Sequence, residues 1–171
     1  FLREKLDNTF KRNSDIEEHL LLPVLAEVAL IKKQKDQPFV PERYMASAPR
    51  TSFSEAINNV RTGILFSNLD NPVKTLLVTS TITGEGKTTL ATNLAISFSQ
   101  LGRTLLIDGD MRKTSVQRIT NMEKGAGLSG WLLESHKLKD CVTPDAECKN
   151  LFVMPTGKLP PNPLELLSSK T

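Results

Sequence analysis

Long apolar runs, cysteine and excess charge of either sign are scarce in this chain of 171 residues. No apolar run is long enough to cross a bilayer, and no signal peptide is visible. Cys141 and Cys148 lack a CxxC spacing, so we expect reduced thiols in a cytoplasmic protein. A net charge of only +3 argues against nucleic-acid binding. The remaining composition, 39% hydrophobic and 24% charged, is that of a globular domain.

Composition divides the chain near residue 50. Residues 1–50 comprise a predicted lead-in and a predicted linker. The lead-in, residues 1–35, is charged and helical in pattern, and the linker, residues 32–50, contains three prolines. Residues 51–171 predict one organised domain. Because the chain opens on Phe1 rather than Met and stops after an apparent helix start, we expect a piece of something longer.

Local signals predict short elements before the main domain. Ser14 with Glu17, and Ser52 with Glu55, fit the capping box that opens a helix. Residues 24–31 predict a short strand. The apolar face of the second helix is predicted to comprise Ala56, Ile57, Val60 and Ile64.

Strand and helix patterns alternate through the domain. Apolar runs predict buried strands, and stretches with helical spacing predict helices between them, in the order strand 74–80, helix 88–101, strand 104–108, helix 128–138 and strand 151–155. Such alternation is typical of α/β proteins. We therefore expect a parallel sheet with helices on both faces.

A glycine-rich loop joins the first predicted strand to its helix. It reads 81-TITGEGKT-88, which fits the phosphate-loop pattern G-x-x-x-x-G-K-[ST] except that Thr81 replaces the first glycine. Gly84 and Gly86 would let backbone N–H groups turn towards phosphate oxygens. The helix that follows would direct the positive end of its dipole at them.

The end of this loop carries the side chains expected to bind nucleotide. Lys87 would reach the β and γ phosphates, and the Thr88 hydroxyl would ligate Mg²⁺. Glu85 and Thr89 complete the predicted nucleotide-binding stretch. The competing interpretation is a glycine-rich turn with a surface lysine; the flanking strand and helix favour nucleotide binding.

Two carboxylates follow the second predicted strand, in 105-LLIDGDMR-112. Asp108 and Asp110 would lie at the carboxyl end of that strand, where parallel sheets bind ligands. They would hold the Mg²⁺ shell and accept a proton from an attacking oxygen. Arg112 would neutralise phosphate charge or pair with an aspartate. The competing interpretation is that the aspartates only cap the turn.

These two motifs resemble the Walker A and Walker A′ motifs of the bacterial tyrosine kinases (BY-kinases), the cytoplasmic kinase domains of polysaccharide co-polymerases. The segment 55-EAINNVRTGILF-66 is similar to their E-x-x-R-x-x-R helix. The segment 155-PTGKLPPNPLELL-167 resembles their Pro-rich stretch before a helix. The lead-in 14-SDIEEHLLLPVLAEVAL-30 resembles the stretch after their second transmembrane helix.

The resemblance implies a P-loop NTPase-like fold of the MinD/ParA deviant group. It also implies an autophosphorylating protein tyrosine kinase that uses ATP and Mg²⁺. Lys87 would bind phosphate and Thr88 would ligate the metal. Asp108 would activate the attacking tyrosine hydroxyl, with Asp110 supporting the metal shell.

Partners and location follow from the same resemblance. Glu55 and Arg61 would lie at the contact that packs kinase domains into a ring-like homo-oligomer. The other implied partners are the tyrosine-rich tail of neighbouring subunits, the machinery that exports capsular polysaccharide and exopolysaccharide, and a cognate tyrosine phosphatase. The protein would lie on the cytoplasmic side of the bacterial inner membrane, without a nucleic-acid partner.

The chain departs from the family pattern in several places. Asn58 stands where the helix motif has its first arginine, and Thr81 replaces a small residue. No apolar strand ending in aspartate follows 151–155, so the Walker B motif is missing. The single tyrosine, Tyr44, lies in the linker, so the tyrosine-rich tail is missing too. We expect both beyond Thr171.

Two alternatives remain. A ParA/MinD-type ATPase switch would use water as the phosphoryl acceptor, but that group has an additional early lysine that residues 81–86 lack. A nucleotide-binding regulatory module would control polysaccharide polymerisation by assembly alone, without kinase activity.

Overall fold

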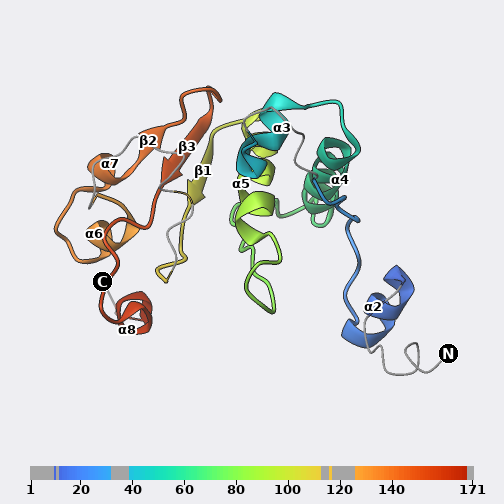
Figure 1. Ribbon diagram of the computed structural model, residues 1–171, viewed down its shortest axis with the longest axis horizontal. Coiled ribbons are helices and arrows are strands. Elements are labelled where there is room, and N and C mark those ends of the chain that lie inside the picture. Colours follow the sequence, from blue (N-terminus) through green and yellow to red (C-terminus); the bar gives the residue numbers. More distant parts are fainter. Residues whose placement is uncertain (1–9, 11, 32–38, 113–115, 117–125, 169–171) are drawn as a thin grey trace.

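The computed structural model describes residues 10, 12–31, 39–112, 116 and 126–168 (Figure 1). The helices are α2 (Asn13–Leu20), the 3-10 helix η1 (Pro41–Arg43), α3 (Tyr44–Ser47), α4 (Ser52–Phe66), α5 (Lys87–Ser99), α6 (Leu128–Leu132), α7 (Leu138–Cys141) and α8 (Pro163–Ser168). The strands are β1 (Thr104–Ile107), β2 (Thr143–Pro144) and β3 (Leu151–Met154).

The strands form one sheet in the order β1-β3-β2. β1 and β3 pair in parallel from Thr104 opposite Leu151 to Ile107 opposite Met154, which confirms the α/β prediction and its parallel pair. The short strand β2 pairs antiparallel with β3, with Thr143 opposite Val153. The sequence did not reveal β2, because two residues carry no periodic signal.

The main core lies where α4 and α5 pack against the sheet. Leu106, Leu151 and Val153 project from the strands into this core. The predicted apolar face of α4 is confirmed, because Ala56, Ile57 and Ile64 are buried and Val60 packs against them. Successive strand residues point to opposite faces.

A second, smaller core lies on the other face of the sheet. Met154 follows Val153 and so points away from α5, into a cluster with residues of α6, α7 and α8. In Figure 1, α5 lies on one side of the sheet, next to β1, and α6, α7 and α8 lie on the other side. Helices therefore cover both faces, as expected.

The apolar run 74–80 differs from its prediction as a buried strand. The structure gives it no strand, and its Leu77 is 87% exposed. An apolar run becomes a strand only when a neighbouring backbone pairs with it. β1 is at the edge of the sheet, with Leu105 and Ile107 about half exposed, and no described strand occupies the space beside it.

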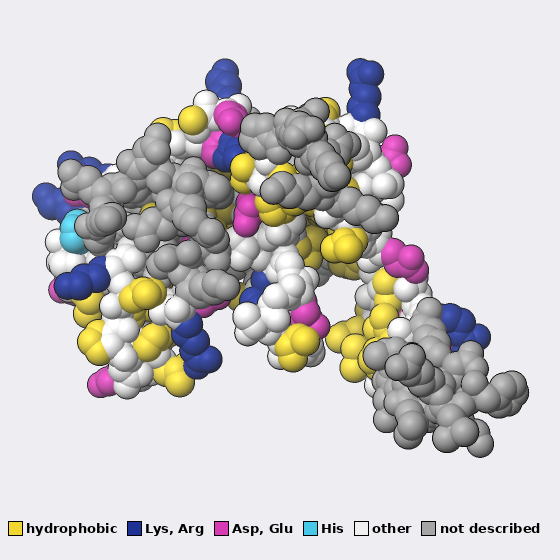
Figure 2. Space-filling model, in the orientation of Figure 1, with side chains coloured by type: hydrophobic (Ala, Val, Ile, Leu, Met, Phe, Trp, Pro, Cys, Tyr) yellow, Lys and Arg dark blue, Asp and Glu magenta, His cyan; other side chains and the backbone are white. Residues whose placement is uncertain are grey.

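The other strand prediction outside the sheet, residues 24–31, is also wrong. This segment has no regular structure, and its leucines are exposed, as are Leu21 and Leu22 just before it. Figure 2 shows hydrophobic side chains gathered along this connection between α2 and the rest of the molecule. No helix among the described residues is long and apolar enough to cross a membrane.

Both predicted capping boxes are corrected. α2 begins one residue before Ser14 without a side-chain cap, and Glu17 instead accepts a hydrogen bond from the N–H of Val24 at 2.9 Å. α4 is capped by Thr51, whose hydroxyl accepts from the N–H of Ser54 at 3.3 Å. Adjacent Thr51 and Ser52 can both cap a helix, and only Thr51 has the extended backbone of an N-cap.

The predicted linker is partly ordered. Met45 is 2% exposed and belongs to the same core cluster as α4 and α5. The ring of Tyr44 packs edge-on against Phe53 of α4 at 5.5 Å. The domain boundary at residue 50 stays a prediction, although these contacts attach residues 44–45 to the domain.

Candidate functional site

The loop 81–86 leads directly into α5. Gly84 and Gly86 have φ angles of 94° and 88°, a left-handed conformation that glycine adopts without strain. Open space lies beside the Cα atoms of both glycines. Gly86 caps α5, whose first residue is Lys87, so the free N–H groups of the first turn lie at this loop. These features fit a site for phosphate groups.

Glu85 holds the start of this loop. Its carboxylate accepts hydrogen bonds from the N–H groups of Thr81 at 3.0 Å and Ile82 at 3.2 Å. The hydroxyl of Thr81 donates to the same carboxylate at 3.1 Å. The bond from the N–H of Ile82 is the main reason that the pKa of Glu85 lies below its ordinary value. Thr81, a departure from the family pattern, therefore braces the loop.

The side chains that follow lie in the first turn of α5. The ammonium group of Lys87 donates to the hydroxyl of Ser80 at 2.9 Å, so this partly buried side chain folds back over the loop. Thr88 and Thr89 are also partly buried. Ser80 could not be predicted as part of the site, because a single serine before a glycine-rich loop carries no pattern of its own.

Asp108 and Asp110 follow β1 and organise their own loop. The buried carboxylate of Asp108 accepts from the N–H of Asp110 at 3.1 Å and the N–H of Val116 at 3.2 Å. The exposed carboxylate of Asp110 accepts from the N–H of Arg112 at 3.1 Å. Arg112 is exposed. In this conformation both aspartates cap the turn.

Thr156, two residues beyond the end of β3, holds this aspartate loop in place. Its hydroxyl is fully buried and donates to the carbonyl oxygen of Asp108 at 3.1 Å. The backbone of Gly127 lies against the residues on either side of Thr156. A Cβ atom at Gly127 would lie 2.4 Å from the carbonyl oxygen of Pro155. Thr156 could not be predicted as part of the site, because its contact depends on the pairing of β1 with β3.

The phosphate loop and the aspartate loop lie at the same edge of the molecule (Figure 1). This is the carboxyl edge of the parallel pair, where α/β proteins bind ligands. The described residues contain no cluster of three or more metal-ligating side chains. Mg²⁺ is usually held by one or two carboxylates together with substrate phosphates. Thr88, Asp108 and Asp110 supply oxygens of the required type.

The predicted contact residues on α4 behave differently from one another. Glu55 is exposed, whereas the guanidinium group of Arg61 donates to the carbonyl oxygen of Ser97 on α5 at 2.8 Å. Asn58 accepts from the hydroxyl of Ser97 at 2.8 Å. Asn58 and Arg61 therefore join α4 to α5 within the chain. Their role between subunits stays a prediction.

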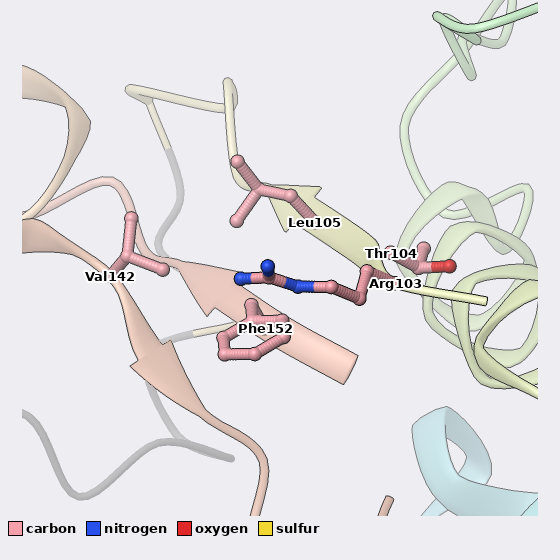
Figure 3. A pocket seen from close by; sticks show the side chains of 5 residues that line it. All are labelled: Arg103, Thr104, Leu105, Val142 and Phe152. Carbon is pink, nitrogen blue, oxygen red and sulfur yellow. The ribbon is translucent and has the colours of Figure 1, made fainter. Parts of the chain in front are cut away.

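A pocket lies at the opposite end of the sheet. Its volume is about 210 Å³, and Figure 3 shows the side chain of Arg103 extending over the ring of Phe152, with Leu105 and Val142 beside it. The guanidinium carbon lies 5.1 Å from the ring centre, a cation–π contact. None of the predicted site residues lines this pocket.

Comparison with known sequences finds protein kinases. Tyrosine-protein kinase YwqD of Bacillus subtilis is 42% identical over 123 residues, which cover 71% of the chain and 52% of YwqD. Tyrosine-protein kinase Wzc of Salmonella typhimurium is 32% identical over 181 aligned residues, 99% of the chain and 25% of Wzc. The chain spans about half the length of YwqD and a quarter of Wzc. No protein-family model matches the chain.

Solved structures give the same answer. The chimerical protein CapA2B2 superposes with a TM-score of 0.78 at 34% identity, over 92% of the chain and 66% of CapA2B2. The kinase domain of the Escherichia coli tyrosine kinase ETK superposes with a TM-score of 0.75 at 25% identity, over 91% of the chain and 63% of that domain.

Proposed function

Because the chain belongs to the bacterial tyrosine-protein kinases, we propose that it forms the nucleotide-binding part of an autophosphorylating protein tyrosine kinase. The reaction would transfer the γ-phosphoryl group of ATP to a tyrosine hydroxyl. The observation that carries this proposal is the pair of left-handed glycines leading into α5, at the same edge as the Asp108 loop.

The proposed roles follow from position. The loop amides and the side chain of Lys87 would hold the phosphates, and Glu85 would keep the loop open. Thr88 and Asp110 would hold Mg²⁺, which would supply positive charge against the phosphate oxygens.

Asp108 would take the proton from the tyrosine hydroxyl. As it does so, the tyrosine oxygen would bond to the γ-phosphorus, and the bond between the γ-phosphorus and the oxygen of the leaving ADP would break. In this structure the two carboxylate oxygens of Asp108 each accept one N–H group, from Asp110 and from Val116, which leaves lone pairs for the hydroxyl. Arg112 is exposed beside this loop and would neutralise phosphate charge.

A further strand would complete the sheet. The exposed run 74–80 and the exposed Leu105 and Ile107 of β1 are apolar surfaces without a sheet neighbour among the described residues. They are consistent with the Walker B strand that we expect beyond Thr171, and its place would be beside β1.

The wider context is proposed from the resemblance to the BY-kinases. A ring-like homo-oligomer would form through Glu55 and Arg61, and the tyrosine-rich tail of a neighbouring subunit would be the substrate. The kinase would regulate polymerisation and export of capsular polysaccharide or exopolysaccharide from the cytoplasmic side of the inner membrane, and a cognate phosphatase would reverse it.

A phosphorylation assay tests the proposal. The natural full-length protein would be incubated with Mg²⁺ and γ-labelled ATP beside Lys87→Met. The matched control is Lys139→Met, which removes an exposed lysine in α7. We expect label on tyrosine in the parent and the control only.

The other outcomes separate the alternatives. Label found only as free phosphate would identify the ATPase switch, with water as the acceptor. Nucleotide binding without any transfer would identify the regulatory module.

A further inference from the structure

Residues 41–47, which comprise η1 and α3 and are called the strap below, are held by a buried side chain of α5. Asn93 has no exposed surface. Its carbonyl oxygen accepts from the N–H of Met45 at 2.7 Å. Its amide nitrogen donates to the carbonyl oxygens of Pro41 and Thr89, both at 2.8 Å. One side chain thus joins the strap to the first turns of the helix that begins at Lys87.

The strap has a second anchor at the loop between β2 and β3. The guanidinium group of Arg43 makes two parallel hydrogen bonds of 2.7 Å to the carboxylate of Asp145. It also donates to Glu147 at 2.9 Å and 3.0 Å. The side chains of Arg43 and Asp145 are 16% and 3% exposed. Bidentate pairs of this kind fix orientation as well as distance.

The hydrogen bond from Arg43 lowers the pKa of Asp145 to about 2. The carboxylate of Asp145 also accepts from the N–H groups of Glu147 and Cys148, at 3.0 Å and 2.9 Å. The acceptor for Arg43 is therefore itself fixed, and Asp145 stays ionised at neutral pH.

The two anchors join the strap to α5 on one side and to the loop between β2 and β3 on the other. Figure 1 shows α3 lying against α5, and Met45 fills the core beneath it. A displacement of the strap must break the bonds at Asn93 or those at Arg43. The bond from Asn93 to Thr89 reaches the first turn of α5, beside Lys87 and Thr88, the residues proposed to hold phosphate and Mg²⁺.

We propose that the strap sets the position of the first turns of α5, and thereby the affinity of the phosphate loop for nucleotide. Asn93 is a positioning residue for Lys87 and Thr88, and the Arg43–Asp145 pair locks the strap in place. Any partner that moves the chain preceding the strap can change nucleotide binding through this connection. The proposal deepens the proposed kinase function and rests on the same nucleotide site.

The test uses charge reversal in the full-length protein. Arg43→Glu and Asp145→Arg each place like charges together, and the double variant restores an opposite pair. Arg50→Glu is the matched control, because Arg50 is an exposed arginine near the strap. Asn93→Ala is examined beside them. Fluorescent ADP reports nucleotide affinity, and hydrogen exchange without nucleotide reports the amides of residues 87–92.

We expect each single variant to weaken ADP binding at least about fivefold, the lower end of ordinary coupling between sites. Exchange in residues 87–92 would accelerate more than exchange in α4. The double variant would restore both properties in part, because it recovers the ion pair but not the acceptor for the N–H groups of Glu147 and Cys148. The proposal is overturned if the single variants lower the melting temperature but leave ADP affinity and exchange like those of Arg50→Glu. Absence of phosphotyrosine in the parent would refute the kinase alone, because exchange is read without nucleotide.

Discussion

The body of α5 and the phosphate loop before it are held by different kinds of contact. Residues 92–97 of α5 are buried, and Asn93 and Ser97 bond to segments about 40–50 positions away in the sequence. The loop 81–86 is exposed, and Glu85 bonds to residues only three or four positions away.

This difference separates stability from binding. Long-range buried contacts resist unfolding, so changes in the body of α5 and its neighbours should lower the free energy of unfolding. A loop held by local bonds can exchange them for contacts with a ligand, and changes to its side chains cost the fold little. Substitutions in the body of α5 should therefore lower stability, and substitutions in the phosphate loop should lower nucleotide binding.

The largest effect on stability is expected at Ile57 of α4, which is fully buried in the main core. Ile57→Ala should lower the free energy of unfolding by about 3 kcal/mol, because burial is lost and a cavity forms. The matched control is Ile82→Ala in the phosphate loop, where the side chain is 66% exposed. Chemical denaturation measures both. Equal losses in the two variants would contradict the comparison.

Thr156, two residues beyond β3, tests the aspartate loop. The N–H of Asp108 donates to the carbonyl oxygen of Met154 in β3, and the buried Thr156 hydroxyl donates to the carbonyl oxygen of Asp108. Thr156→Val should lower the free energy of unfolding by about 2 kcal/mol, because the buried carbonyl oxygen of Asp108 loses its donor. Thr156→Ser keeps the hydroxyl and should lose less. Denaturation of the three proteins checks this order. If Ser and Val variants were equally unstable, the hydroxyl would have no role.

The sequence predicted what depends on local pattern. Residue type and periodicity predict the turn at Gly84 and Gly86 and the helix α5 that follows it. They also predict the strands β1 and β3. The α/β class follows from their alternation. The family resemblance rests on four segments in the right order, and the similarity to YwqD and CapA2B2 confirms it.

The sequence could not predict what depends on tertiary partners. Runs 74–80 and 104–107 are similarly apolar, yet only the second has a strand beside it, so only the second is a strand. Ser80, Asn93 and Thr156 act through single contacts that carry no spacing rule. The roles assigned to Lys87, Asp108 and Asp110 stay predictions, and the phosphorylation assay tests that of Lys87.

The Arg43–Asp145 pair should make stability depend on pH. The pKa of Asp145 falls from 3.8 to about 2 on folding, so the folded state favours the ionised carboxylate. Its contribution is present above about pH 4 and is lost as pH falls through about 2. Discounted for partial solvent screening, we expect about 1 kcal/mol at pH 5.

Denaturation of the parent and of Asp145→Asn at pH 5 and pH 2.5 measures this contribution. The two proteins should differ at pH 5, and the difference should shrink at pH 2.5. A difference that stayed constant between the two pH values would mean that the carboxylate's ionisation is not coupled to folding.

The smallest change in stability is expected at Lys87, on the loop side of the comparison. Its ammonium group has one hydrogen bond, to Ser80, in a partly exposed position. Lys87→Met keeps most of the apolar stem and should change the free energy of unfolding by no more than about 0.5 kcal/mol. The same substitution should abolish most nucleotide binding, because no other lysine lies in the loop. Denaturation and ADP titration of one protein sample measure both quantities. A large loss of stability with little loss of affinity would place Lys87 with the body of α5 and remove the distinction between the two regions.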